Sequence, residues 1–328
     1  GFRLRNKQDW AEQGYELAAD QVAIPNPQPN KPAVANSGGP LQVNKSANGL
    51  TVTGDNFAVE FDSQSGALTQ LRYHGQPMLE RALEFNAFRC PVNNDVWTMG
   101  KWFEQGLREL RQRATDFKFE MLGDSVRVSA TVMARGTEAE RCVDFGGNHT
   151  RVETQGPLDD RALEIQSQVA WTVFADGSVA MQAALVPSKP VIALPKIGVR
   201  TELPERFANV TYFGRGPEEN YPDRKSGSFV GLYSRTVREM FVPYARPNDM
   251  ANREDVRWFA VTDATGEGLL FASLEKPLSA AALAYSADEL LLANHPPELP
   301  VSHRTVVTLD AAVLGLGGAS CGPGPLER

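Results

Sequence analysis

Alternation of apolar and polar residues is the feature that most constrains the fold of this chain. The clearest case is residues 163–185, LEIQSQVAWTVFADGSVAMQAAL, where apolar side chains take nearly every second position on both sides of an Asp-Gly pair. A period of two places alternate side chains on one face of a β-strand, and Asp176-Gly177 tolerates the positive φ of a tight turn. The stretch therefore predicts an antiparallel hairpin with one buried face.

The same period recurs after residue 50. Residues 125–136, SVRVSATVMARG, put one residue in two on an apolar face, namely Val126, Val128, Ala130, Val132 and Ala134. Further alternating runs occupy residues 256–261, 268–274 and 305–318. Helical spacing occurs only in residues 100–113, GKWFEQGLRELRQR. Many antiparallel strands with one short helix predict an all-β fold, a large β-sandwich.

Composition divides the chain into three parts. Residues 23–49 are rich in Pro, Asn, Gly and Ser and carry almost no large apolar side chain, which is typical of a semi-extended linker. Residues 1–22 alternate weakly before it and are interpreted as a strand that ends a preceding domain. Residues 50–328 are predicted to form the large β domain.

Charge and hydropathy exclude several partners. The net charge of −7 and pI near 5.3 give no basic surface for nucleic acid. No run approaches the roughly 18 apolar residues of a membrane span, and residues 1–10 lack the apolar segment of a signal peptide. We expect no nucleic-acid or membrane partner and a cytoplasmic location, or a periplasmic one if an upstream signal is missing from this fragment.

Metal and cofactor motifs are absent from the sequence. The 3 cysteines, Cys90, Cys142 and Cys321, lack CxxC spacing and are predicted to be free thiols. None of the 4 histidines has metal-ligand spacing to another, and no P-loop, dinucleotide fingerprint or serine elbow occurs. His295 precedes two prolines and could line a cleft, although a lone histidine is more often structural or exposed.

Residues 212–224, YFGRGPEENYPDR, contain two adjacent carboxylates, Glu218 and Glu219. A retaining glycosidase needs two carboxyl groups about 5 to 5.5 Å apart that flank one bond. Adjacent residues of an extended segment point to opposite faces, so these two cannot serve as that pair. We interpret the segment as a tight loop fixed by side-chain bonds and an ion pair, made by Glu219, Asn220, Asp223 and Arg224.

Residues 85–97, FNAFRCPVNNDVW, form a second polar constellation. The amides of Asn93 and Asn94 and the carboxylate of Asp95 offer paired donors and acceptors that could orient sugar hydroxyls. An Asx turn that leads into the predicted helix explains the same residues at least as well.

These motifs together resemble the C-terminal domain of large bacterial β-galactosidases of glycoside hydrolase family 2. Residues 212–224 are similar to the family pattern W-x-G-x-GP-x-ENYPDR, and FRCPVNND is similar to FRAPxDND. PYARPNDMANREDVRW, residues 243–258, is similar to PYxxPQENGNRxDVRW, and LGLGG, residues 314–318, matches the run before the closing loop of the family. The four motifs occur in the family order over most of the chain.

The resemblance implies a galactose-mutarotase-like β-supersandwich, with residues 1–22 as the last strand of a preceding immunoglobulin-like domain. In that family the catalytic glutamates lie in a TIM barrel, which no segment here matches. The resemblance therefore implies that this chain alone is inactive. The parent enzyme would hydrolyse terminal β-galactosides with retention, and this chain would partner the barrel domain or a large subunit. Cofactors are expected in none of these 328 residues; any Mg²⁺ or Na⁺ would belong to the barrel.

Two departures from the family pattern concern ligand contacts. A sugar-stacking Trp follows the GLGG run in the family, whereas Cys321 or Gly322 stands here. Asn248 and Asp249 replace a Gln-Glu pair and keep polarity with shorter reach. From the resemblance we expect Asn93, Asn94, Asp95, Ser320 and Cys321 to contact the galactoside.

Two other functions remain open from the sequence. The chain could be a free-standing carbohydrate-binding module, because similar folds occur without hydrolase activity. It could also be an assembly domain that only mediates subunit contacts.

Overall fold

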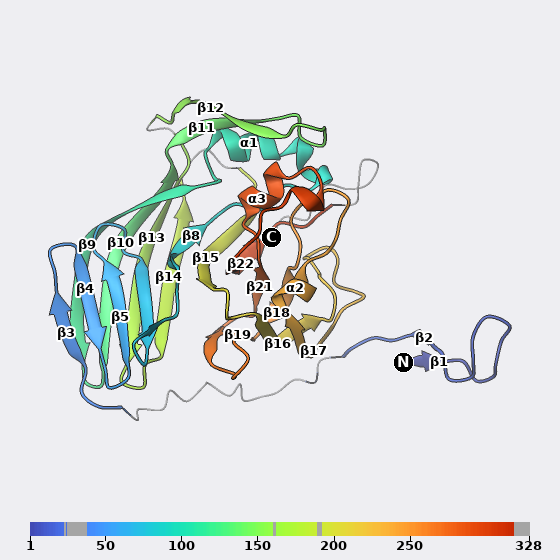
Figure 1. The fold of residues 1–328 in the computed structure, drawn as a ribbon, viewed down its shortest axis with the longest axis horizontal. Helices are drawn as coiled ribbons and strands as arrows, with labels where there is room; N and C mark the ends of the chain where they lie inside the picture. Colours follow the sequence, from blue (N-terminus) through green and yellow to red (C-terminus); the bar gives the residue numbers. More distant parts are fainter. Residues whose placement is uncertain (23, 25–37, 160–161, 189–191, 318–328) are drawn as a thin grey trace.

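Three antiparallel sheets form the body of the protein. The computed structural model describes residues 1–22, 24, 38–159, 162–188 and 192–317 (Figure 1). Every strand pairing recorded within these residues is antiparallel. The structure confirms the prediction of an all-β fold.

The first sheet is built from the strongly alternating stretches. Its four strands, in the order β14-β13-β10-β9, are β9 (Leu110–Leu122), β10 (Ser125–Gly136), β13 (Glu164–Phe174) and β14 (Val179–Pro187). Asp176-Gly177 forms the predicted turn, and Gly177 has φ +87°. The predicted apolar faces of β10 and β13 are buried, with Val126 and Val173 at 0% exposure.

The second sheet has ten strands and links the two ends of the body. Its order is β18-β21-β22-β15-β8-β6-β5-β4-β3, with β7 paired to β6. The strands are β3 (Gln42–Lys45), β4 (Gly49–Thr53), β5 (Phe57–Asp62), β6 (Leu68–Tyr73), β7 (Gln76–Pro77), β8 (Arg81–Asn86), β15 (Lys196–Pro204), β18 (Arg253–Val256), β21 (Leu278–Leu283) and β22 (Arg304–Val313).

Four strands make the third sheet, in the order β17-β16-β19-β20. They are β16 (Asn209–Gly216), β17 (Phe229–Thr236), β19 (Trp258–Thr262) and β20 (Gly268–Ala272). A separate hairpin of β11 (Glu138–Val143) and β12 (Arg151–Pro157) lies above the body beside the first helix (Figure 1).

One core runs between the sheets. Strands β3 to β5 lie over β9, β10 and β13 (Figure 1), and the Phe61 and Trp171 rings pack across this interface at 5.9 Å. Trp171 Nε1 also donates to the Gly66 carbonyl at 3.1 Å, which satisfies its only polar group. Within the third sheet, the rings of the cross-strand pair Tyr212 and Phe259 stack with their centroids 5.9 Å apart, and both side chains are buried in this core.

The helices are short and more numerous than predicted. They are α1 (Met99–Glu104), α2 (Val237–Met240), α3 (Ala287–Leu292) and the 3-10 turns η1 (Asn93–Trp97) and η2 (Pro296–Glu298). The helix expected over residues 100–113 ends early, because Gly106 adopts φ +61° and β9 begins at Leu110. The apolar residues at helical spacing in this stretch therefore belong first to helix α1 and then to strand β9.

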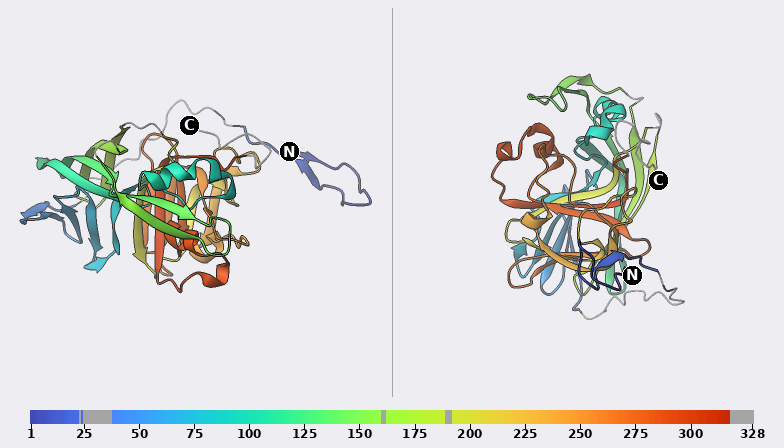
Figure 2. Two further views of the ribbon diagram at one scale, coloured as in Figure 1. Left: turned by 90° about the horizontal axis from the view of Figure 1, so that it is seen from above. Right: turned by 90° about the vertical axis from the view of Figure 1, so that its right-hand side faces the viewer.

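The N-terminal segment differs from the expected single strand. Strands β1 (Phe2–Arg3) and β2 (Glu16–Ala18) form a small hairpin that stands away from the body (Figure 2, left). Gln21 connects it to the third sheet through two hydrogen bonds with the Val230 main chain, at 2.8 and 2.6 Å.

The segment interpreted as a linker, residues 23–49, is partly structured. Strand β3 pairs with β4, so the second sheet begins at Gln42 and not at residue 50. The pairing of Val43 with Val52 gives this polar stretch an apolar anchor. Residues 23 and 25–37 lie outside the described part of the chain. No helix among the described residues is long and apolar enough to cross a membrane.

Candidate functional site

A buried ion pair between Arg89 and Asp95 forms the centre of the candidate site. Asn86 ends β8 by bonding the Phe88 main chain, which turns the chain toward η1. Arg89 Nη2 donates to Asp95 Oδ1 at 2.8 Å, and both side chains are 0% exposed. The Val92 N–H donates to Asp95 Oδ2 at 2.9 Å. Burial opposes the charge of the guanidinium, but the carboxylates of Asp95 and Asp249 together outweigh it, so the pKa of Arg89 is raised above its ordinary value.

The same turn holds residues 314–317, which follow β22. The Arg89 guanidinium donates to the first two carbonyl groups of this run. Asn94 Nδ2 donates to the next carbonyl, that of Leu316, at 2.9 Å. Side chains of this one turn therefore bind three consecutive carbonyl groups, which lie beyond the end of β22 and so outside its strand pairing.

Asp223 holds the donors of the same run. Its two carboxylate oxygens accept from the N–H groups of Leu316 at 3.0 Å and Gly317 at 2.8 Å. Gly315 permits this approach, because a Cβ there would lie 2.2 Å from Asp223 Oδ2. The two polar motifs of the sequence thus meet at residues 314–317, immediately before residues 318–328.

Glu219 fixes the loop that carries Asp223. Its carboxylate accepts from the Ala251 N–H at 2.9 Å, from the Tyr244 hydroxyl and from Arg224. Its side chain is 7% exposed, whereas that of the neighbouring Glu218 is 79% exposed and forms an ion pair with Arg235 at 3.3 Å. The two glutamates therefore face different surroundings, as expected from their adjacency.

Asn220 ties the loop to the segment before β18. The Glu254 N–H donates to its side-chain oxygen at 2.8 Å, and its own N–H donates to the Asn252 carbonyl at 2.9 Å. Asn252 returns a bond of 2.8 Å from its amide to the Asn220 carbonyl. The bonds made by Glu219, Asn220, Asp223 and Arg224 support the structural role expected for them.

A second buried charge cluster lies next to the ion pair. The Tyr221 hydroxyl donates to Asp249 Oδ2 at 3.0 Å, and Lys196 Nζ lies 3.5 Å from Asp249 Oδ1 and 3.6 Å from Asp310 Oδ2. Burial raises the pKa of Asp310 to about 7, although Lys196 opposes this rise. Lys196 thus shares one positive charge between two buried carboxyl groups.

The residues that the sequence predicts to contact the sugar differ in their exposure to solvent. Asn93 is exposed and Asn94 is partly buried with its amide engaged, while Asp95 is fully buried and bonded at both oxygens. Direct contact of Asp95 with a ligand does not fit this position, and its role is to hold the turn. Ser320 and Cys321 lie outside the described residues.

Trp97 is a feature of this turn that sequence reasoning missed. It ends η1 with 84% of its surface exposed, next to Val96 at 47%. An exposed aromatic beside an exposed Asn side chain, here Asn93, is typical of a binding surface. The sequence signal that could have found it is the apolar pair Val96-Trp97, which follows the polar residues 93–95 directly and belongs to no alternating run.

Neither His295 nor the two described cysteines, Cys90 and Cys142, form a further candidate site. His295 is exposed and pairs with Glu298 at 3.0 Å, so it lines no cleft. Cys90 is buried and Cys142 is partly buried, and both are free thiols. Within the described ranges, no group of His, Cys, Asp and Glu is arranged to hold a metal ion.

Comparison with known proteins identifies the family. The profile described as beta galactosidase small chain matches residues 53–328. The chain belongs to the beta-galactosidase small chain family. Curated β-galactosidases of Priestia megaterium and Lactobacillus delbrueckii subsp. bulgaricus are each 30% identical to it, over 97% and 96% of this chain, and that of Vibrio cholerae is 27% identical over 96%.

The small chain covers only part of these relatives. It spans 28% to 29% of their length, which implies a larger partner region in the relatives. Among solved structures, galactose 1-epimerase from Lactobacillus acidophilus is similar over 82% of this chain and 98% of its own, with 9% identity and a TM-score of 0.28. That TM-score carries no argument about function.

Glu219→Ala tests the anchoring of the loop. We expect this variant to lose about 2 to 4 kcal/mol of unfolding free energy, because a buried carboxylate with three donors is removed. Arg224→Ala should lose less, because its side chain is 51% exposed. Glu218→Ala is the matched control and should leave stability unchanged. Denaturant unfolding measures all three, and equal midpoints would contradict the structural role.

Asp310→Asn tests the buried carboxyl. Because its pKa is about 7 when folded and 3.8 ordinarily, the folded state holds this proton more tightly than the unfolded chain. Asp310 therefore lowers stability as the pH rises from about 4 to about 7. Between about pH 5 and about pH 8, we expect the melting temperature of the native chain to fall further than that of Asp310→Asn. Asp124→Asn, at an exposed turn, is the control; parallel profiles for native chain and Asp310→Asn would refute the shift.

Proposed function

We propose that this small chain completes and closes the galactoside pocket of a β-galactosidase. The catalytic glutamates would be supplied by a TIM-barrel domain or large subunit outside these 328 residues. With two carboxyl groups about 5 to 5.5 Å apart on that barrel, the enzyme would release galactose with retention. The chain alone would be inactive.

The convergence of two motifs on residues 314–317 carries this proposal. Arg89, Asn94 and Asp223 bind consecutive backbone groups there, so the main chain has a fixed position up to Gly317. A pocket wall contributed by one domain to another needs this preorganisation, because a loop that must be ordered on binding reduces affinity. Ser320 and Cys321 follow this anchored run in the sequence and are proposed to contact the sugar with Asn93 and Asn94.

Trp97 supports a carbohydrate ligand at this rim. The turn that carries it is fixed, since Asn94 and Asp95, which precede it, are hydrogen-bonded. An aromatic face favours the apolar face of a pyranose. We propose that Trp97 provides the stacking surface that residues 321 and 322 do not.

A chimeric enzyme tests the proposed function. The region of the Priestia megaterium β-galactosidase that matches this chain is deleted, or replaced by the whole chain. We expect no hydrolysis of a nitrophenyl β-galactoside by the chain alone or by the deleted enzyme, activity in the chimera, and β-galactose as the first anomer seen by NMR. A folded, correctly assembled chimera without activity would favour the assembly-domain alternative.

Trp97→Ala in the chimera tests the stacking role. Loss of one stacking contact of roughly 1.4 kcal/mol should raise KM about tenfold, with unchanged melting temperature. Trp10→Ala, an exposed Trp of the N-terminal hairpin, is the control. An unchanged KM with weaker domain association would show that Trp97 docks on protein instead.

Calorimetric titration of the chain alone with galactose tests the alternative of a free-standing carbohydrate-binding module. That alternative requires tight binding.

A further inference from the structure

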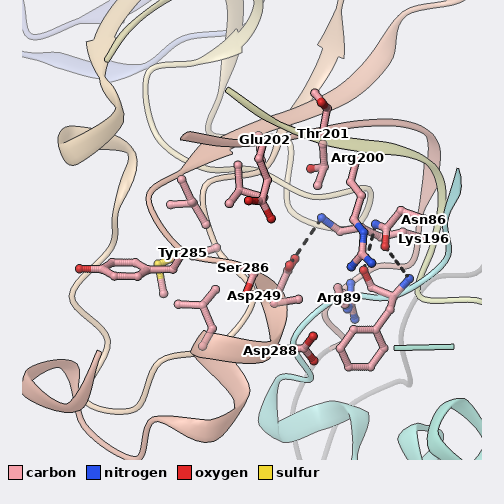
Figure 3. A pocket seen from close by; sticks show the side chains of 18 of the residues that line it. Asn86, Arg89, Lys196, Arg200, Thr201, Glu202, Asp249, Tyr285, Ser286 and Asp288 are labelled. Carbon is pink, nitrogen blue, oxygen red and sulfur yellow. Dashed lines mark hydrogen bonds and ion pairs between the residues drawn. The ribbon is translucent and has the colours of Figure 1, made fainter. Parts of the chain in front are cut away.

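A cavity of about 180 Å³, lined by both charged and apolar side chains, lies on one face of the second sheet. Figure 3 shows it between strands β15 and β22 on one side and the start of α3 on the other. Tyr285 and Asp288 at this edge are only partly buried, so solvent reaches it. A cavity near 150 Å³ holds a benzene molecule, and this volume therefore suits a ligand of up to one six-membered ring.

Strand register explains why one wall of the cavity carries charged and polar side chains. Arg200 of β15 pairs with Thr308 of β22, and Glu202 pairs with Val306, so these side chains share one face. The opposite face carries Leu203 and the apolar core. This part of the cavity wall is therefore mostly polar, while apolar side chains such as Leu283 and Leu290 line the rest.

Most cations around the cavity already have a carboxylate. Their ion pairs are Arg81 with Glu84 at 3.0 Å, Arg89 with Asp95 at 2.8 Å, Lys196 with Asp249 at 3.5 Å, and Arg304 with Glu202 at 2.9 Å and Glu289 at 2.8 Å. The lining carboxylate of Asp288 is engaged by Arg108 at 2.8 Å. These charges are matched within the protein.

Arg200 is the exception in the part of the chain that is described. It makes no ion pair there, and its Nε is buried without a hydrogen-bond partner. The Oγ1 of Thr308, its register partner, is also buried without a partner. Burial first, and then the neighbouring charge of Arg81, lower the pKa of Arg200. Glu84 and Asp288 oppose this shift from a distance, but no carboxylate among the described residues is in direct contact with the guanidinium. A buried donor group without an ion pair favours an anion.

We propose that this cavity binds a small oxyanion, a carboxylate or phosphate group on a molecule no larger than one sugar ring, with Arg200 as its main contact. The anion contacts the Arg200 guanidinium; Nε and the Thr308 hydroxyl are buried, so they donate to it once these two side chains shift toward the cavity. A neutral sugar of the same size satisfies hydroxyl groups but leaves the guanidinium uncompensated. The cavity shares Arg89 with the candidate site, but its main contact, Arg200, bonds neither Trp97 nor residues 314–317, so Arg200→Gln tests the anion site separately from the proposed galactosidase function.

Calorimetric titration of the 328-residue chain tests the site. The probes are inorganic phosphate, galacturonate and galactose at equal ionic strength, so that the carboxylate and phosphate sources are compared with a neutral ring. We expect one-to-one binding of at least one anion and none of galactose. Arg200→Gln should weaken anion binding about tenfold or more, as for loss of a charged hydrogen bond. Arg127→Gln, on the exposed face of β10, should bind as the native chain does.

Thermal unfolding provides a second readout. The anion should raise the melting temperature of the native chain and of Arg127→Gln, but not of Arg200→Gln. Thr308→Val, which keeps the side-chain shape, should weaken anion binding several-fold. It replaces Arg200→Gln as the test variant if Arg200→Gln does not fold. Absence of binding by both anions, equal binding of galactose, or full affinity when Arg200 or Thr308 is replaced would overturn the proposal.

Discussion

The fully buried ion pair of Arg89 and Asp95 is the interaction on which the rest of the candidate site depends. Removing two charges from water is unfavourable unless nearly every donor and acceptor finds a partner. Here the Val92 N–H and the carbonyl groups of Leu314 and Gly315 complete the bonding. The pair therefore joins the end of β8 to the end of β22, two strands that flank β15 on opposite sides. Neither residue could be lost alone without leaving an uncompensated buried charge.

Alternation explains how a β protein places such charges inside. Along β15 and β22 the same face carries Lys196, Arg200 and Asp310, while the other face carries Leu203 and Val307 in the core. A slip of one residue would exchange the two sets, so burial of the apolar face fixes the polar one. The charge cluster and the cavity are thus consequences of a single strand register.

Local patterns predicted the strands well, and long-range contacts account for the failures. The faces of β10 and β13 follow directly from alternation, and the separation of Glu218 from Glu219 follows from adjacency. In contrast, the burial of Asp95 depends on Arg89 and on a run that lies more than 200 residues further along the chain. The early end of α1 depends on one positive φ at Gly106. Such pairings and dihedrals leave no periodic signal in the sequence.

The motifs that identify the family are largely structural. Glu219, Asn220 and Asp223 direct their polar atoms at backbone groups, which leaves them little capacity for a ligand. Residues that bond backbone at fixed spacing tolerate little change, because both their length and their charge are used. Exposed groups such as Trp97 and Asn93 have no such constraint and can vary with the ligand. A domain of this kind can therefore keep its anchoring motifs while its ligand-facing rim changes, as the exchange of a sugar-stacking Trp from the last loop to η1 would require.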